Sequence, residues 1–171
     1  MGLFSSVEKL PTLEDLLHHE IADLYSAEDQ LISALPKMAE AATDPTLKSA
    51  FTEHLQETKG QRERLLRISQ ILNFEVDNTT CKAMKGLVAE GEEIIKSKAE
   101  PLVKDAGLIG AAQRVEHYEM AGYGTAMGLA QELGHQDVNA LLEETLNEEK
   151  NADKKLSQIA VSRVNKQAQH T

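Results

Sequence analysis

The segment Ala111–Ala126, AAQRVEHYEMAGYGTA, decides the fold of this chain because it combines helical periodicity with two acidic residues at its centre. Read as a helix, it belongs to a stripe whose members recur every three or four positions: Ile109, Ala112, Glu116, Glu119, Tyr123, Ala126, Ala130 and Leu133. Such a stripe faces a protein core, yet Glu116 and Glu119 lie in its middle. Because an unpaired buried carboxylate is too costly for ordinary packing, positive charge should meet both residues.

Three other stretches combine an apolar stripe with polar residues at its centre, and each is predicted to be a helix. The first stripe contains Leu17, Ile21, Leu24, Glu28, Leu31, Leu35 and Met38. The second contains Leu47, Phe51, His54, Thr58, Gln61, Leu65, Ile68 and Leu72. The last contains Val138, Leu142, Thr145, Glu149, Ala152, Leu156 and Ile159. Glu57 lies one turn from His54, and Asp153 lies one turn after Glu149, so both are further candidates for the same faces.

Capping and helix-breaking residues set the boundaries of these helices. Thr12 is a good N-cap for a helix that should end near Ala42. Asp44 followed by Pro45 starts the next helix, which should end near Asn73. The connection between the two helices is so short that they must be antiparallel neighbours.

A shorter helix is predicted over residues 80–98, where Glu100-Pro101 stops it. This segment is interpreted as a crossover that returns the chain to the end where the second long helix began. The third long helix should start near Asp105 or Ala106 and end at Leu133, with Gly134 as its left-handed C-terminal residue. The fourth should begin near Gln136.

Composition favours one all-α domain. The 171 residues are 41% hydrophobic, which supplies a core, whereas aromatic residues are only 4% and Trp is absent. We therefore predict a helical bundle over residues 12–160, with an N-terminal extension over residues 1–11. A C-terminal tail over residues 161–171 is expected to fray, since the apolar pattern ends there.

Charge and cysteine usage exclude several classes of function. The formal net charge of −10 argues against binding to a nucleic-acid backbone. A single cysteine, Cys81, excludes an internal disulfide framework and fits a reducing compartment. The first ten residues do not have the pattern of a secretory signal, and no later run is long and apolar enough to be a membrane span. The chain is therefore expected to be cytoplasmic, with neither a membrane nor a nucleic acid as partner.

The polar positions of the four stripes should lie at one depth in the bundle. With a rise of about 1.5 Å per residue, Glu28 comes level with Glu57 across the turn near Asp44. Across the turn at Gly134, Glu119 likewise comes level with Glu149. If the crossover makes the second and third long helices parallel, all four helices place their stripe carboxylates in one layer.

Three explanations for this layer can be weighed from the sequence. A buried ion-pair layer needs basic residues on the stripes, but none is present, and only Arg64 and Arg114 lie close enough to be secondary partners. Two metal ions would balance four to six carboxylates. With at most one imidazole and otherwise oxygen ligands, iron or manganese is favoured over zinc or copper. An empty site of protonated carboxylates would instead show strongly raised pKa values.

The succession of acidic helices resembles the ferritin-like di-iron carboxylate superfamily, and Glu116-x-x-Glu119 is similar to the rubrerythrin pattern. More closely, LYSAEDQL, AFTEHLQETKGQRERL, AAQRVEHYEMAGYGTA and LNEEKNADKKL resemble segments of the stress-associated bacterial YciE/YciF family, with the YciE branch as the expected match. The resemblance covers nearly all of residues 12–160. It implies a ferritin-like four-helix bundle with an additional short helix in its long crossover, two iron ions or alternatively manganese, and a homodimer.

The resemblance carries the superfamily's acidic metal ligands over onto five positions: Glu28, Glu57, Glu116, Glu119 and Glu149. The histidine role matches His54 only loosely, because the superfamily usually has Glu-x-x-His on two helices, whereas here His54 precedes Glu57. The last helix has no histidine, and Asp153 is added as a candidate ligand on its spacing from Glu149.

Two hypotheses for function follow. The first is a ferritin-like di-metal protein of the stress response that oxidises Fe(II) or reduces peroxide or O₂, in which case no separate catalytic base is implied. A rubrerythrin-type electron path would then need an external electron donor, since this chain carries no second metal-binding module. The alternative is a structural or interaction protein in which the metal acts as a folding clamp.

Overall fold

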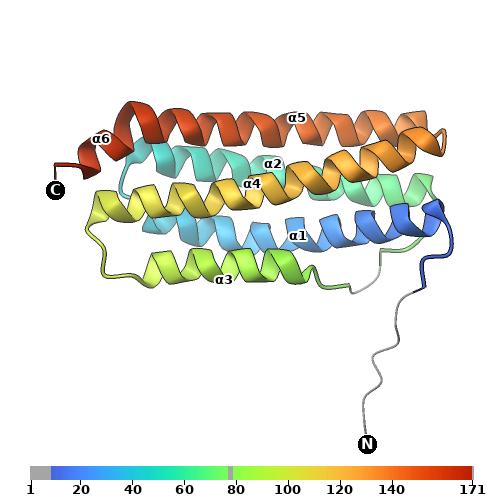
Figure 1. Cartoon of the computed structure of the whole chain (residues 1–171), viewed down its shortest axis with the longest axis horizontal. Coiled ribbons are helices and arrows are strands. Elements are labelled where there is room, and N and C mark those ends of the chain that lie inside the picture. The colour runs from blue at the N-terminus through green and yellow to red at the C-terminus, as the bar shows by residue number, and fades with distance from the viewer. Residues whose placement is uncertain (1–8, 77–78, 171) are drawn as a thin grey trace, which may run out of the picture.

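The computed structural model describes residues 9–76 and 79–170, and these residues form an all-helical protein without strands, as predicted (Figure 1). Its main helices are α1 (Leu13–Ala41), α2 (Pro45–Ile71), α3 (Lys82–Lys96), α4 (Pro101–Glu132) and α5 (Gln136–Ile159). The π-helix η1 (Ala160–Val164) and the short helix α6 (Asn165–Ala168) follow directly after α5. Most of the predicted N-terminal extension, residues 1–8, lies outside the described residues, as does Thr171.

The helices pack lengthwise, and each long helix contacts two long neighbours. Helix α1 packs against α2 and α4, and α5 packs against the same two helices from the other side. Helix α3 lies along α1 and α4. The chain direction alternates, so that α2 and α4 run parallel to each other and opposite to α1, α3 and α5 (Figure 1). Helix α3 therefore returns the chain as the sequence predicts. Within the described residues, no helix is long and apolar enough to cross a membrane.

The first two helices begin at the predicted caps. The Thr12 hydroxyl accepts a hydrogen bond from the Asp15 backbone N–H at 3.1 Å, and the Asp15 carboxylate accepts one from the Thr12 N–H at the same distance. The Asp44 carboxylate accepts from the N–H groups of Thr46 and Leu47 at 2.8 and 3.1 Å. Both arrangements satisfy backbone donors that a helix start would otherwise leave without a partner.

The prediction that the third long helix starts at Asp105 or Ala106 is wrong, because α4 begins at Pro101. Proline is compatible with the first turn of a helix, so Pro101 starts α4 as well as following the end of α3. Asp105 then lies within the helix and is fully buried. Its two carboxylate oxygens accept hydrogen bonds from the backbone N–H groups of Thr43 and Asp44, at 2.9 and 2.7 Å. Asp105 thus ties α4 to the connection between α1 and α2.

The chain also stays helical beyond the predicted end of the bundle. The π-turn of η1 changes the spacing of the apolar residues, so that Val164 is fully buried although it does not continue the stripe of α5. In the same segment, the Arg163 side chain donates a hydrogen bond to the Asp44 carboxylate. Residues 160–168 therefore pack against the bundle rather than leaving it at residue 160.

Glycines allow two close helix contacts. A Cβ atom on Gly122 would lie 2.8 Å from Leu24 Cδ2 of α1, and one on Gly107 would lie 2.9 Å from Ile94 Cγ2 of α3. Neither position has room for a side chain without movement of its neighbour. Gly134 adopts the predicted left-handed conformation after α4, with φ of 81°.

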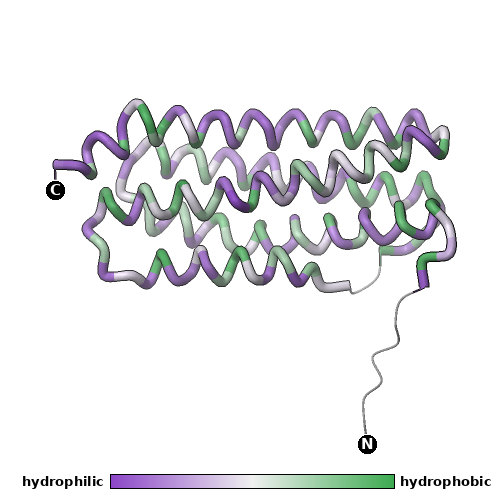
Figure 2. The backbone as a smooth tube through the Cα atoms, in the orientation of Figure 1, coloured by the Kyte–Doolittle hydropathy of each residue, from purple (hydrophilic) through white to green (hydrophobic). Residues whose placement is uncertain are grey.

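Two apolar clusters fill the interior, one toward each end of the bundle. One cluster includes Leu35, Phe51 and Leu108, and the other includes Leu17, Leu65 and Val138. Between them along the four long helices lie the buried polar residues Glu28, His54, Thr58, Gln61, Glu116, Glu119 and Glu149. The middle of α4 is accordingly hydrophilic in Figure 2, with more hydrophobic turns on either side. The predicted layer of polar residues at one depth is therefore present.

We expect Asp105→Ala to lower the free energy of unfolding by about 3 kcal/mol, because two backbone donors would lose a charged acceptor. Asp105→Asn keeps one acceptor oxygen but turns its amide N–H groups toward the other backbone donor, so it should cost a similar amount. Urea denaturation followed by circular dichroism measures both values. A loss below about 0.5 kcal/mol for Asp105→Ala would show that this contact does not hold α4 in place.

Candidate metal centre

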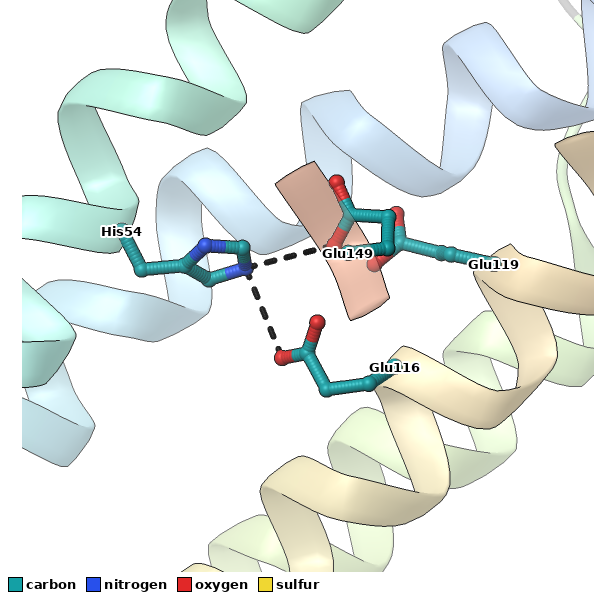
Figure 3. A group of neighbouring side chains, drawn as sticks. All are labelled: His54, Glu116, Glu119 and Glu149. Atoms are coloured by element: carbon teal, nitrogen blue, oxygen red, sulfur yellow. Dashed lines mark ion pairs between the residues drawn. The ribbon is translucent and has the colours of Figure 1, made fainter. Parts of the chain in front are cut away.

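Four side chains from three helices converge in the middle of the bundle. His54 of α2, Glu116 and Glu119 of α4, and Glu149 of α5 each offer one ligand atom, and these four atoms all lie within 4.8 Å of one another. Figure 3 shows His54 pointing at the carboxylates of Glu116 and Glu149. All four side chains are buried, and His54 is the most exposed of them at 7%. The spacing is suited to ligands that surround one ion.

His54 links this group to the outside of the bundle. Its Nδ1 lies 3.1 Å from the Glu57 carboxylate, whereas its Nε2 lies 3.4 Å from Glu116 and 3.8 Å from Glu149. A proton assigned to Nδ1 would be donated to Glu57, leaving the Nε2 lone pair directed at the cluster. A carboxylate that orients a histidine through its outer nitrogen is typical of metal sites.

The acidic oxygens at the centre have few partners. Glu149 accepts a hydrogen bond from the Gln61 amide. The buried atoms without a hydrogen-bond partner include both oxygens of Glu119, one oxygen each of Glu28, Glu116 and Glu149, and His54 Nε2. Buried polar atoms are normally satisfied, so a concentration of unsatisfied ones indicates a missing partner. Among the described residues, no Lys or Arg lies within ion-pair distance of these carboxylates. The buried ion-pair explanation therefore fails.

Glu28 lies beside the four-residue group rather than within it. It is fully buried on α1, and one of its oxygens accepts a hydrogen bond from the Tyr123 hydroxyl. Its negative charge contributes to raising the pKa of both Glu116 and Glu119. With its second oxygen unpartnered, Glu28 can supply a further ligand on the α1 side of the layer.

Besides Glu28, two further predicted ligands lie outside the four-residue group. The Glu57 side chain is 51% exposed and contacts the cluster only through His54. Asp153 accepts a hydrogen bond from Gln113 at 2.9 Å and lies 3.4 Å from His117 Nε2, so it belongs to a polar group on the outer side of α4 and α5. The structure therefore brings together His54, Glu116, Glu119 and Glu149, with Glu28 next to them.

Burial and mutual repulsion shift the pKa values of the acidic residues. Burial is the main cause that raises the pKa of Glu28, Glu116 and Glu119 well above the ordinary value of 4.5, and neighbouring carboxylates add to it. The pKa of Glu149 is also raised by burial, although the charge of His54 opposes this. Burial lowers the pKa of His54, but its hydrogen bond to Glu57 and the nearby carboxylates outweigh this, so the net shift is upward.

Sequence reasoning did not assign the residues that hold the carboxylates in place. Gln61 lies on the α2 stripe, so the burial of its amide could have been predicted from the sequence. In the structure this amide donates a hydrogen bond to Glu149. Tyr123 lies on the predicted α4 stripe, and its buried hydroxyl donates a hydrogen bond to Glu28. Arg64 donates to Glu144 and Glu148 at 2.7 and 3.0 Å, so it does not neutralise the buried layer.

The donor set of this centre fits iron or manganese. One imidazole and four carboxylates form an oxygen-rich set, which these ions accept, and no cysteine takes part. In their ionised forms, the buried carboxylates also need positive charge that the described residues do not supply. The residues present therefore fit a metal centre.

Comparison with known proteins identifies relatives along nearly the whole chain. A sequence profile of a family described as a domain of unknown function, DUF892, matches residues 12–169. The YciF protein of Escherichia coli is 46% identical over 162 residues, which cover 94% of this chain and 98% of YciF. This match supports a relationship to YciF rather than to the YciE branch expected from the sequence.

Solved structures share the fold of this chain. The Escherichia coli stress protein YciF superposes with a TM-score of 0.89 at 46% identity, over 92% of this chain and 99% of YciF. YcfI from Rhodopseudomonas palustris, described as a candidate structural protein, gives a TM-score of 0.86 at 44% identity, with 92% and 99% covered. A Xanthomonas campestris protein with 20% identity and a TM-score of 0.72, over 90% and 94%, shares the fold. The chain therefore belongs to the DUF892 family and is similar to the stress protein YciF over nearly its whole length.

Proposed function

We propose that this chain is a ferritin-like di-metal carboxylate protein of the stress response that binds two iron or manganese ions. The observation that supports it is the buried layer of Glu28, Glu116, Glu119 and Glu149, together with His54, that has no Lys or Arg ion pair among the described residues. Helices α1, α2, α4 and α5 would form the ferritin-like four-helix bundle, and α3 would be the additional helix of its crossover.

Charge balance favours two ions over one. Four ionised carboxylates carry four negative charges, which two divalent cations balance, whereas one divalent cation would leave two buried negative charges. His54, Glu116, Glu119 and Glu149 would hold one ion, since their ligand atoms lie together. Glu28 would complete a second position with the neighbouring carboxylates, because one of its oxygens has no partner.

Iron or manganese bound in this layer would supply oxidation and reduction chemistry with Fe(II), peroxide or O₂. The protein's own residues would set the conditions for it. Tyr123 fixes Glu28, Gln61 fixes Glu149, and Glu57 orients His54. The two apolar clusters shield the layer from water along the length of the bundle, which strengthens the electrostatic interactions within it.

The relatives support the biological setting of this proposal. YciF of Escherichia coli is a stress protein and is 46% identical to this chain. We extend this setting to the present chain, with a cytoplasmic location, a homodimer and an external electron donor as further parts of the proposal. A donor is required for catalytic reduction of peroxide or O₂, because such a reaction consumes electrons.

A structural role is the second candidate, and the description of YcfI favours it. In that case the metal would clamp four helices together without turnover. The two roles differ in their response to metal removal. Loss of Fe(II) oxidation or peroxide reduction on chelation, restored by added metal, would support the first role. A lower melting temperature on chelation, in a protein that has neither activity when loaded, would support the second.

We expect about two iron or manganese atoms per chain after anaerobic loading of the purified protein, as measured by elemental analysis. The double variant Glu28→Ala, Glu116→Ala should lose most of this metal, because each position would be deprived of a ligand. The exposed pair Glu90→Ala, Glu143→Ala makes the same change of charge and should retain it. Equal metal content in all three proteins, or no metal in any of them, would contradict the proposed site.

The stability of the metal-free protein should depend on pH in an unusual direction. Glu28, Glu116 and Glu119 have raised pKa values in the folded state, so folding favours their protonated forms. Their stabilising contribution is complete at pH values below their pKa in the unfolded chain, which is near 4.5. It is lost as the pH rises through their pKa values in the folded protein. We therefore expect the free energy of unfolding to fall by at least about 1 kcal/mol between roughly pH 5.5 and pH 8.

Urea denaturation at both pH values, with and without metal, measures this effect. The variant Glu119→Gln should show a weaker pH dependence, since one of the three groups no longer titrates. Bound metal should reverse the trend, because metal binds the ionised carboxylates more strongly as the pH rises. A metal-free protein that is more stable at the higher pH than at the lower one would show that these carboxylates do not control its stability.

A further inference from the structure

A cavity of about 120 Å³ leads from the surface between α2 and α5 to the candidate metal centre. His54 and Glu116, two members of the cluster, form its inner end. Both are buried, and each has an atom without a hydrogen-bond partner. Glu57 and Lys155 line the outer part, where their side chains are 51% and 47% exposed. The cavity therefore connects solvent with unsatisfied ligand atoms of the cluster.

The size of the cavity limits what can pass through it. A volume of 120 Å³ has room for several water molecules, so a metal ion with part of its hydration shell can be accommodated. A large organic cofactor, whose pockets measure about 300 Å³ or more, is too big to be enclosed in it. Phe51 and Leu156 form part of the side wall and are almost fully buried, which keeps the passage narrow.

Three glutamates and one lysine line the cavity, so its charge favours a cation. Lys155 pairs with Glu53, and Glu148 accepts a hydrogen bond from Arg64 at 3.0 Å. Glu57 differs from Glu53 and Glu148, because its ion-pair partner among the described residues is a histidine, His54, rather than a Lys or Arg. Since His54 Nδ1 faces Glu57 and its Nε2 faces Glu116, one imidazole spans the boundary between the cavity and the buried layer.

We propose that divalent cations reach the buried layer through this cavity, with Glu57 as the outer ligand that passes the ion to His54 and Glu116. This inference rests on the proposed metal centre. This role fits the exposed position of the Glu57 side chain. The sequence prediction had placed Glu57 among the ligands of the buried layer. The opening between α2 and α5 would then admit small hydrated divalent ions.

The test is the rate at which Mn²⁺ binds the full-length metal-free protein, followed by quenching of tyrosine fluorescence in a stopped-flow instrument. The chain has three tyrosines and no Trp, and Tyr123 contacts Glu28 in the layer. We expect Ala152→Leu to slow association at least about tenfold, because Ala152 lines the cavity and the larger side chain would fill it. Ala140→Leu, at an exposed position of the same helix, is the matched control and should bind at the parent rate.

Glu57→Gln provides a second variant that does not change the packing. Loss of one attracting charge should slow association about threefold to tenfold at low salt, and less at high salt. Elemental analysis at saturating Mn²⁺ measures separately whether both sites still fill, because Glu57 also orients His54. Glu143→Gln removes an exposed charge elsewhere on α5 and should have no such effect.

The outcomes separate this inference from the proposed function. Parent-like association rates in both Ala152→Leu and Glu57→Gln, with normal metal content, would overturn the route and leave the metal centre in place. Equal slowing in the matched controls would overturn it as well. A parent protein that binds no Mn²⁺ would overturn both the centre and the route.

Discussion

The constraint on which the structure depends is the burial of four carboxylates at one depth without a basic partner among the described residues. Glu28, Glu116, Glu119 and Glu149 come from three helices, and His54 comes from a fourth. Each apolar cluster occupies one side of this layer. The interior is thus a polar plane between two cores rather than one continuous core. A metal ion in that plane would offset the repulsion that raises the carboxylate pKa values, and this links the stability of the fold to its proposed chemistry.

Most of the fold and the centre of the site follow from the sequence, because helical periodicity determines both which residues share a face and how deep they lie. The placement of Glu116, Glu119 and Glu149 follows in this way. Periodicity does not determine which way a side chain turns, so Glu57 and Asp153 could not be separated from true cluster members. It also fails where the spacing changes, as in the π-turn that buries Val164. The bonds from Asp105 to the α1–α2 connection depend on tertiary packing, which a sequence pattern does not contain.

Membership of the DUF892 family does not decide between the two proposed roles, because that family is described as a domain of unknown function and a relative is described as structural. The geometry bears on the choice more directly. A purely structural clamp needs a closed set of ligands, whereas this centre keeps a solvent-connected cavity that ends at His54 and Glu116. Ligand atoms at the end of a narrow passage are suited to exchange of ions or small oxidants with solvent. If the proposed metal centre is present, this cavity fits a centre that exchanges ligands better than one that only holds helices together.

The central claim is that two metal ions occupy the buried layer, and anomalous X-ray diffraction from crystals loaded with Mn²⁺ or Fe²⁺ tests it most directly. We expect two anomalous peaks, one among His54, Glu116, Glu119 and Glu149 and a second on the side of Glu28. Crystals in which this layer shows no anomalous density after loading, while the carboxylates keep their positions, would contradict the claim. The layer would then be a set of protonated carboxylates that stabilises the fold without metal.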